Sequence, residues 1–398
     1  MRDVTGTTQV TLKKGTADPE LFSLLGELPR ESVIEIEGTV RRSEKAHRGV
    51  ELVPTEVRVV TRAEVPLPLG VVDKVGAELD TRFNHRVLDL RKPAIRQVFE
   101  LRAAVLEGMR RAYTERGFLE VETPKLLRQG AEGGATLFRV DYFDRVAYLA
   151  QSPQLYKQML MGAGFERVFE IAPAFRAEPS DTVRHLTEFT SVDAEMAYVD
   201  SADDLRAALE SVVAETLRYA RERLSARENP LADGIPVATT PFPRIPFATC
   251  EEWLGRPGAE QDLSPEDERT IGARVMKEQE APFYFLTDFP TAPKAGTFYA
   301  RRQDENPRLT WYFDLDFLGL EIASGGLREH RMVRLLENMR TAGADPANFE
   351  GYLEAFRYGM PPHGGWGFGL DRFVQQLAGL ANIREGRLFP RDRYRLDP

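Results

Sequence analysis

The stretch Phe165–Val199, which reads FERVFEIAPAFRAEPSDTVRHLTEFTSVDAEMAYV, has the pattern of two β-strands joined by a polar loop. Apolar residues fall on alternate positions of Phe165–Glu178, and the alternation returns in Thr190–Val199, where Asp193 and Glu195 share one face. Because the side chains of a strand point alternately to its two faces, one face of this hairpin is apolar and the other is charged. We therefore expect a hairpin around which the rest of the fold is organised.

The loop and flanks of this hairpin concentrate charge that a purely structural hairpin does not need. Arg176 and Glu178 extend the polar face of the first strand, and the loop Pro179–Phe189 adds Arg184 and His185. A guanidinium group is a rigid planar fork that binds phosphate or carboxylate oxygens through two parallel hydrogen bonds. The cluster therefore indicates a polyphosphate-binding site, and the alternative is a salt-bridged face in contact with solvent.

The composition limits the classes of protein that remain. A chain of 398 residues has room for two or three domains. Its 53 basic and 62 acidic side chains give a net charge of −9, which argues against a general nucleic-acid binder but allows a local basic face. Cys250 is the single cysteine, which excludes an intrachain disulfide and a cysteine-based zinc site. Without a membrane-spanning apolar run or a signal-peptide pattern, we expect a cytoplasmic protein.

Three segments resemble, in the expected order, the three motifs of the class II aminoacyl-tRNA synthetases: GFLEVETPKL (Gly117–Leu126, motif 1), FRAE, RHLTEF and D-x-EM within 175–196 (motif 2), and GGWGFGLDRF (Gly364–Phe373, motif 3). Four more segments are similar to aspartyl-tRNA synthetases of the archaeal and eukaryotic type: QSPQLYKQ (Gln151–Gln158), GLEIASGG (Gly319–Gly326), REHR (Arg328–Arg331) and LFPRDRYRL (Leu388–Leu396). The resemblance runs from about Arg86 to Pro398, and a weaker one precedes it.

The resemblance implies an α+β fold with a class II catalytic domain at 86–398, an antiparallel sheet flanked by helices. A linker or hinge at 62–85 and a partial OB-fold anticodon-binding domain at 1–61 would precede it. The pieces with strand character at 7–13, 32–42 and 50–61 match only the later part of such a barrel, so we expect an incomplete OB-fold and an N-terminally shortened chain. By resemblance Gln9 and His47 contact tRNA; the alternative for Gln9 is an ordinary exposed glutamine.

The resemblance also implies an ATP site with Arg176 and Arg372 as the catalytic residues. Phe189 would cover one face of the adenine and Arg372 the other. The implied ATP-binding residues are Arg176, Glu178, Arg184, His185, Leu186, Phe189, Glu321, Gly369, Leu370, Asp371 and Arg372. Asp314, Glu321 and Ser324 offer the hard oxygen ligands that Mg²⁺ prefers beside nucleotide phosphates, so we expect magnesium as a second cofactor.

An aspartate pocket is implied next to the ATP site. Gln154 and Lys157 are three residues apart and so share a helix face. Arg328 is the candidate to bind the β-carboxylate, because a bidentate fork discriminates a carboxylate from a carboxamide. Leu327 departs from the glutamine usual in the family, which would loosen the pocket. The implied aspartate-binding residues are Glu132, Gln154, Lys157, Arg176, Asp193, Ser324 and Arg328.

The predicted reaction activates L-aspartate with ATP to aspartyl-adenylate and transfers it to the 3′ end of tRNA(Asp), with tRNA(Asn) left open as a second acceptor. The motif 1 helix and strand imply a homodimer. Two alternatives remain. The first is a related adenylating enzyme, either an asparaginyl enzyme or a tRNA-independent aspartate-adenylating paralogue of the asparagine synthetase kind. The second is a non-catalytic RNA-binding relative. Lys157 and Arg328 oppose the asparaginyl enzyme, and the retained arginines Arg176, Arg184 and Arg372 oppose the non-catalytic relative.

Overall fold

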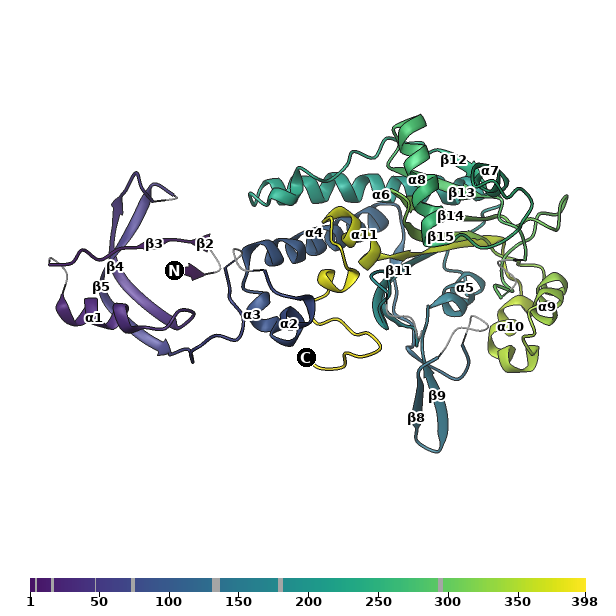
Figure 1. The fold of residues 1–398 in the computed structure, drawn as a ribbon. Coiled ribbons are helices and arrows are strands. Elements are labelled where there is room, and N and C mark those ends of the chain that lie inside the picture. Colours follow the sequence, from purple (N-terminus) through teal and green to yellow (C-terminus); the bar gives the residue numbers. More distant parts are fainter. Residues whose placement is uncertain are drawn as a thin grey trace. The chain divides into compact units, whose positions relative to one another are not determined.

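A computed structural model describes residues 1–3, 6–15, 18–46, 48–72, 76–130, 137–177, 182–292 and 296–398. The chain divides into two compact units, Met1–Gly70 and Val71–Pro398 (Figure 1). The boundary between the units falls within the segment 62–85, which the sequence predicts as a linker. No helix of the described residues is long and apolar enough to cross a membrane.

The described residues of the N-terminal unit form two small sheets and one helix. Its main sheet has the order β3-β5-β4, with β4 antiparallel and β3 parallel to β5, and a separate pair is formed by β1 and β2. Asp18 caps α1 by accepting hydrogen bonds from the backbone N–H groups of Glu20 and Leu21 at 2.8 and 3.1 Å. The bounds are β1 (Arg2–Asp3), β2 (Gly6–Thr7), β3 (Gln9–Val10), α1 (Pro19–Glu27), β4 (Val33–Arg42) and β5 (Val50–Thr61).

The C-terminal unit is built on an eight-stranded sheet with the order β12-β13-β14-β15-β16-β11-β10-β6. The strands are antiparallel from β13 to β10, as the sequence predicts, but the outermost pairs β12–β13 and β10–β6 are parallel, so the sheet as a whole is mixed. The bounds are β6 (Leu119–Glu120), β10 (Arg167–Phe175), β11 (Glu188–Ala197), β12 (Arg244–Pro246), β13 (Phe283–Thr287), β14 (Tyr312–Phe317), β15 (Glu321–Leu327) and β16 (His363–Gly369).

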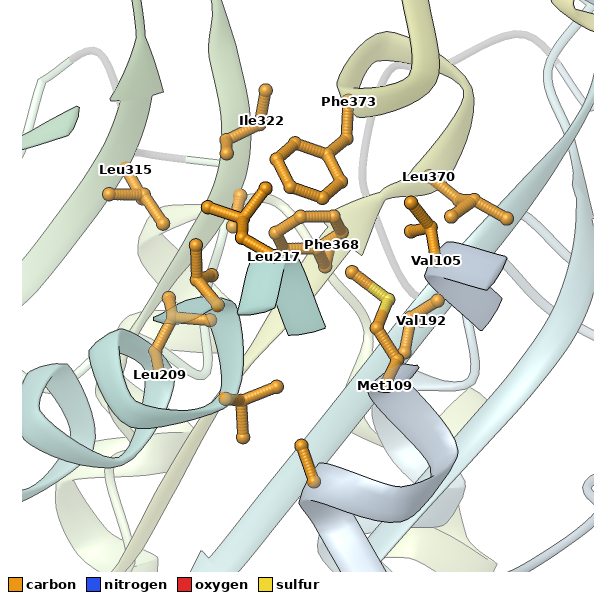
Figure 2. Close-up of a cluster of buried hydrophobic side chains, with 14 of the residues drawn as sticks. Val105, Met109, Val192, Leu209, Leu217, Leu315, Ile322, Phe368, Leu370 and Phe373 are labelled. Carbon is orange, nitrogen blue, oxygen red and sulfur yellow. The ribbon is translucent and has the colours of Figure 1, made fainter. Parts of the chain in front are cut away.

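Two long helices, α4 (Pro93–Glu115) and α6 (Ala202–Ser225), lie side by side and cover one face of this sheet (Figure 1). Figure 2 shows how Val105 and Met109 of α4 and Leu209 of α6 meet strand residues in one buried cluster. Burying an aliphatic side chain of this size contributes roughly 1.5–3 kcal/mol. The cluster therefore fixes the sheet against α4 and α6. It also holds in place the face of β11 that points away from these helices.

The remaining elements of the unit surround the sheet and carry its loops. A small sheet of β7, β9 and β8 precedes α5, and α8 opens with a capping box formed by Ser264 and Asp267. Their bounds are α2 (Leu79–Asn84), α3 (Arg86–Asp89), β7 (Leu126–Leu127), β8 (Arg139–Tyr142), β9 (Arg145–Leu149), α5 (Gln154–Gly162), α7 (Phe247–Trp253), α8 (Pro265–Gln279), α9 (Met332–Thr341), α10 (Glu350–Arg357) and α11 (Leu370–Leu377), with 3₁₀ turns at Pro230–Ala232, Pro346–Phe349 and Ile383–Gly386.

The central hairpin forms as predicted, but β10 is shorter than the pattern suggests, and β11 has the predicted length and begins two residues earlier. β10 and β11 pair in antiparallel register from Arg167 opposite Met196 to Phe175 opposite Glu188. On β11, Val192, Ala194 and Met196 enter the hydrophobic core, while Asp193 and Glu195 point to the other face. The predicted alternation is therefore correct, and it places two carboxylates on the side of the sheet away from α4 and α6.

A glycine on the neighbouring strand makes room for these carboxylates. Gly365 of β16 lies opposite Glu195 in the sheet. A Cβ atom at Gly365 would lie 2.1 Å from the carbonyl oxygen of Ala194 and 2.3 Å from Oε2 of Glu195, far inside van der Waals contact. A side chain at Gly365 is therefore incompatible with the observed position of Glu195, which explains a glycine in the middle of a strand.

Candidate active site

A pocket of about 510 Å³ opens beside the central hairpin. It gathers residues from β11, β15, β16, α5 and the loop between β10 and β11, segments that are far apart in the sequence. Twelve of the predicted site residues line it: Gln154, Arg176, Arg184, His185, Leu186, Phe189, Asp193, Glu321, Ser324, Gly369, Asp371 and Arg372. The two ends of the predicted site, for nucleotide and for amino acid, thus share one continuous pocket.

The other predicted residues have different positions. Lys157 and Arg328 lie behind the pocket wall and bind residues that line it or support it, while Leu370 belongs to the hydrophobic core. Asp314 is buried on β14, opposite Ser324. Gln9 is exposed on β3 in the N-terminal unit. The remaining three predictions, Glu132, Glu178 and His47, lie outside the described residues.

Three arginines define the nucleotide end of the pocket. The guanidinium of Arg176 lies 5.2 Å from the ring centroid of Phe189, in cation–π geometry. Arg184 forms an ion pair with Glu268 of α8. Arg372 Nη1 donates to the backbone carbonyl of Glu321 at 3.1 Å and lies 3.5 Å from its carboxylate. The positive groups predicted from the motifs therefore converge on one pocket.

Asp371 borders this end of the pocket, but its carboxylate binds other residues of the protein. One oxygen accepts a hydrogen bond from Arg102 of α4 at 2.6 Å, and the other accepts from the backbone N–H of Thr190 at 2.7 Å. These bonds tie the first turn of α11 to α4 and to the start of β11. Asp371 therefore positions the helix that carries Arg372, a role that the sequence motif alone does not reveal.

Acidic residues collect on one wall of the pocket. Glu321 and Ser324 line the pocket, and Asp314 faces Ser324 across the sheet. Asp316, two residues further along β14, has its pKa raised well above the usual value by burial and by the negative charges of Glu268, Asp314 and Glu321. Among the described residues, His, Cys, Asp and Glu side chains form no group of three placed to hold a metal ion by themselves. The wall nevertheless has a concentrated negative charge.

At the opposite end, Lys157 binds four acceptors within the protein, one of them the carbonyl oxygen of Ala194 at 3.4 Å. Its Nζ donates to Oδ2 of Asp193 and to the carbonyl oxygen of Trp366, both at 2.9 Å, and lies 3.4 Å from Oε2 of Glu195. The lysine is nearly fully buried, so these charges interact with little screening by water. The cation therefore holds Asp193, which lines the pocket, in a fixed position.

Arg328 is bound to Glu195 by two hydrogen bonds, at 2.9 and 3.3 Å, and its Nη1 donates to the Tyr312 hydroxyl at 2.8 Å. Burial alone would raise the pKa of Glu195, but Arg328 and then Lys157 outweigh it and hold that pKa below its usual value. The rings of Tyr299 and Tyr312, both pocket residues, lie 5.5 and 5.6 Å from the guanidinium. The guanidinium of Arg328 is thus oriented by Glu195 and Tyr312.

Several pocket residues were not predicted as site residues. Glu195, which supports the pocket without lining it, stands out only through its alternation with Asp193, and Tyr312 carries no sequence signal because its contact with Arg328 joins residues 16 positions apart. Gln151 is also buried at the pocket, and neither its side-chain oxygen nor its nitrogen has a hydrogen-bond partner in the described part of the chain. The pocket residues missed include Gln151, Ser152, Ser191, Gly296, Thr297, Tyr312, Ile322, Gly367 and Ile383.

Comparison with known proteins agrees with this geometry. Residues 78–393 match the family of class II tRNA synthetases (D, K and N). The chain is 44% identical to the aspartate–tRNA(Asp) ligase of Thermococcus kodakarensis and 46% identical to the aspartate–tRNA(Asp/Asn) ligase of Methanopyrus kandleri, in each case over 100% of this chain and 91% of the relative. A crystal structure of asparaginyl-tRNA synthetase from Pyrococcus horikoshii with asparaginyl-adenylate superimposes with a TM-score of 0.89 at 30% identity, covering 100% of this chain and 91% of that one. The chain therefore belongs to the class II aminoacyl-tRNA synthetases and, within them, to the archaeal-type aspartyl-tRNA synthetases.

Proposed function

We propose that this protein activates L-aspartate with ATP and transfers the aspartyl group to the 3′ end of tRNA(Asp). The observation that carries the proposal is the pair of buried cations, Lys157 and Arg328, behind the wall at one end of a pocket whose other end holds Arg176, Arg184 and Arg372. Such a pocket suits an acidic amino acid beside a nucleotide polyphosphate. The protein synthesis that such a ligase serves takes place in the cytoplasm, which we propose as its location.

In the first step, an α-carboxylate oxygen of aspartate attacks the α-phosphorus of ATP, and the bond to the β-phosphate breaks to release pyrophosphate. Negative charge grows on the phosphate oxygens, so a fixed cation close to them lowers the barrier. We assign this role to Arg176, while Arg184 and His185 orient the triphosphate. Adenine packs against Phe189, with Arg372 on its other side. No side-chain nucleophile is required, and catalysis rests on positioning the two reactants.

The amino-acid end selects its substrate by donor and acceptor chemistry. Lysine and arginine carry hydrogen-bond donors only. A β-carboxylate offers them acceptors alone, whereas the carboxamide of asparagine would turn its NH₂ group towards a donor. Lys157 and Arg328 therefore favour aspartate, and Asp193 binds the α-ammonium with help from Gln154. Contacts from Glu132 and Ser324 to the substrate complete the proposed aspartate site.

Magnesium fits the acidic wall of the pocket. Glu321, Ser324 and Asp314 would hold the ion, because they supply hard oxygen ligands on neighbouring strands and the local negative charge already raises the pKa of Asp316. When bound, Mg²⁺ would neutralise part of the charge on the ATP phosphates. Glu178 would contribute to the same nucleotide end.

In the second step, a hydroxyl of the terminal tRNA ribose attacks the carbonyl carbon of aspartyl-adenylate, and AMP leaves. We propose that the N-terminal unit, a partial OB-fold, contacts the anticodon through Gln9 and His47. The two relatives differ in the acceptor for which they are named: the Thermococcus kodakarensis enzyme is named for tRNA(Asp), and the Methanopyrus kandleri enzyme is named for both tRNA(Asp) and tRNA(Asn). We propose a homodimer through α4 and the segment 117–124, which is consistent with the exposed side chain of Leu119.

Two assays test the proposal together. Pyrophosphate exchange into ATP should depend on aspartate and on Mg²⁺, because labelled pyrophosphate enters ATP only by attacking the aspartyl-adenylate that aspartate has formed, and this attack releases aspartate. Charging of a tRNA(Asp) transcript with labelled aspartate should then follow, and a tRNA(Asn) transcript in parallel separates the two acceptor choices. Exchange without any charging would favour the tRNA-independent paralogue, and the absence of exchange with every amino acid would contradict the proposal.

A further inference from the structure

We propose that His363 is a positioning residue that fixes the orientation of the Gln154 side-chain amide through Gln158, so that Gln154 presents its oxygen to the substrate ammonium. The inference deepens the proposed function and depends on it for the identity of the substrate. It concerns a chain of three buried side chains on β16 and α5. Neither His363 nor Gln158 is among the residues that line the pocket, so both act behind the residues that would contact the substrate.

The direction of the hydrogen bonds starts from a backbone carbonyl. Nδ1 of His363 lies 2.8 Å from the carbonyl oxygen of Pro361. A carbonyl oxygen only accepts, so Nδ1 carries the proton. In a neutral imidazole the other nitrogen, Nε2, then has a lone pair and accepts a hydrogen bond. Gln158 fills this position, with its Nε2 at 2.9 Å from Nε2 of His363.

Each following bond is determined by the one before it. Because Gln158 donates to His363, its Oε1 faces the other way and accepts from Gln154 Nε2 at 3.1 Å and from the Tyr352 hydroxyl at 3.2 Å. Gln154 thereby uses its NH₂ group inside the protein. Its Oε1 accepts no hydrogen bond from any described residue, and Gln154 lines the pocket. The free group that remains for a ligand is an acceptor.

The reversed arrangement would have the opposite chemistry. The amide groups of Gln154 and Gln158 are nearly symmetrical in shape, so packing alone does not select one orientation. If His363 carried a second proton, Nε2 would donate, Gln158 would turn its oxygen towards it, and Gln154 would present its NH₂ group to the pocket. Two donors, this NH₂ and the substrate ammonium, would then face each other. The neutral state of His363 is thus part of the amino-acid site.

The surroundings of His363 favour this neutral state. Burial lowers its pKa from 6.5 to about 4, with Glu195 on β11 opposing the change and Arg328 and His330 adding to it. The other groups that contact the ring are neutral: Gln158 from α5 and Phe356 from α10, with Tyr352 of α10 bound to Gln158. Near pH 7 the ring therefore accepts at Nε2, which is the state that the hydrogen-bond chain requires.

Two substitutions of Gln158 separate orientation from packing. Gln158→Met keeps the length and volume but removes the acceptor for Gln154, so the KM for aspartate in pyrophosphate exchange should rise about five- to tenfold with little change in the KM for ATP. Gln158→Glu keeps an acceptor towards Gln154, so its KM for aspartate should rise only about twofold. Gln303→Met, which removes a similar amide that binds Asp288 away from the pocket, provides the matched control.

A ligand without the ammonium group sharpens this test. Succinate has both carboxylates of aspartate and no amine, so its inhibition constant should be the same for the parent protein and Gln158→Met, although the KM for aspartate differs. If the inhibition constant of succinate rises as much as the KM for aspartate, the substitution acts by disturbing the whole pocket. That result, or equal KM values for Gln158→Met and Gln158→Glu, would overturn the proposal.

The protonation state is measured directly, without any assay of activity. ¹⁵N NMR of histidine-labelled protein at pH 7 should show His363 neutral with the proton on Nδ1, its signal being assigned by its loss in His363→Gln. A proton on Nε2, or a doubly protonated ring, would contradict the hydrogen-bond chain. This result is independent of which amino acid is activated, so it separates failure of this inference from failure of the proposed function.

Discussion

The two ends of the pocket use positive charge in different ways. At the amino-acid end, the side chains of Lys157 and Arg328 are 3% and 1% exposed and are paired with Asp193 and Glu195. At the nucleotide end, the side chains of Arg184 and Arg372 are 14% and 23% exposed. Because water screens charges that it reaches, the buried pairs interact more strongly and are more costly to break.

The difference indicates a division of labour within one site. The buried network holds the amino-acid end rigid before any ligand arrives, which suits discrimination between substrates of nearly equal shape. The arginines at the nucleotide end have fewer constraints, and they bind a flexible polyphosphate that is the same for every amino acid. Selectivity should therefore depend on the buried end, and the two ends should respond differently to substitution.

The largest effect is expected from breaking the buried network. Arg328→Leu removes both hydrogen bonds to the buried Glu195 carboxylate and leaves only Lys157, 3.4 Å away, to balance its charge, so the free energy of unfolding should fall by about 3–5 kcal/mol and aspartate activation should fall about a thousandfold or more. Urea unfolding and pyrophosphate exchange measure the two effects. Binding of an ATP analogue, followed by calorimetry, should change little, and an unchanged KM for aspartate would refute the assignment of Arg328.

The next effect depends on pH and again concerns the buried end. The folded-state pKa of His363, about 4, lies below its ordinary value of 6.5. The unfolded chain therefore binds an extra proton in this window, so stability is full above about pH 6.5 and is lost as the pH falls towards 4. The loss should amount to about 3 kcal/mol. Urea unfolding of the parent protein and of His363→Gln between pH 4 and 7 should show this part of the slope only in the parent.

A smaller effect on stability is expected from the exposed end. Arg372→Ala removes a partly exposed contact with Glu321, so the free energy of unfolding should change by less than about 1 kcal/mol. The KM for ATP should rise about ten- to a hundredfold, because a cation is lost next to the nucleotide. Thermal unfolding and exchange at varied ATP concentrations provide the two readings. A loss of stability as large as that of Arg328→Leu would remove the contrast between the ends.

The sequence predicts the elements of this site better than their connections. The alternation in 165–199 correctly places Asp193 and Glu195 on one face of a strand, and the three-residue spacing correctly puts Gln154 and Lys157 on α5. The family resemblance adds predicted site residues on β15 and α11. These are local patterns, which depend on the period of a strand or a helix.

What the sequence does not predict are contacts between distant segments. The bond between Arg328 and Glu195 joins residues 133 positions apart, and the bond between Arg102 and Asp371 joins residues 269 positions apart. Such pairs depend on the order of strands in the sheet and on helix packing, which one chain's periodicity does not determine. For the same reason the parallel pairing at both edges of the sheet was not predicted.

The measurement that tests the central claim most directly is pyrophosphate exchange with aspartate and with asparagine, compared through kcat/KM. The two amino acids differ only in the group that faces the buried cations. A site built to bind a carboxylate rejects an analogue that leaves its buried groups poorly paired by about four orders of magnitude. We expect aspartate to be favoured by at least about a thousandfold. Equal exchange with the two amino acids, or a preference for asparagine, would contradict the claim that the buried end selects an acidic substrate.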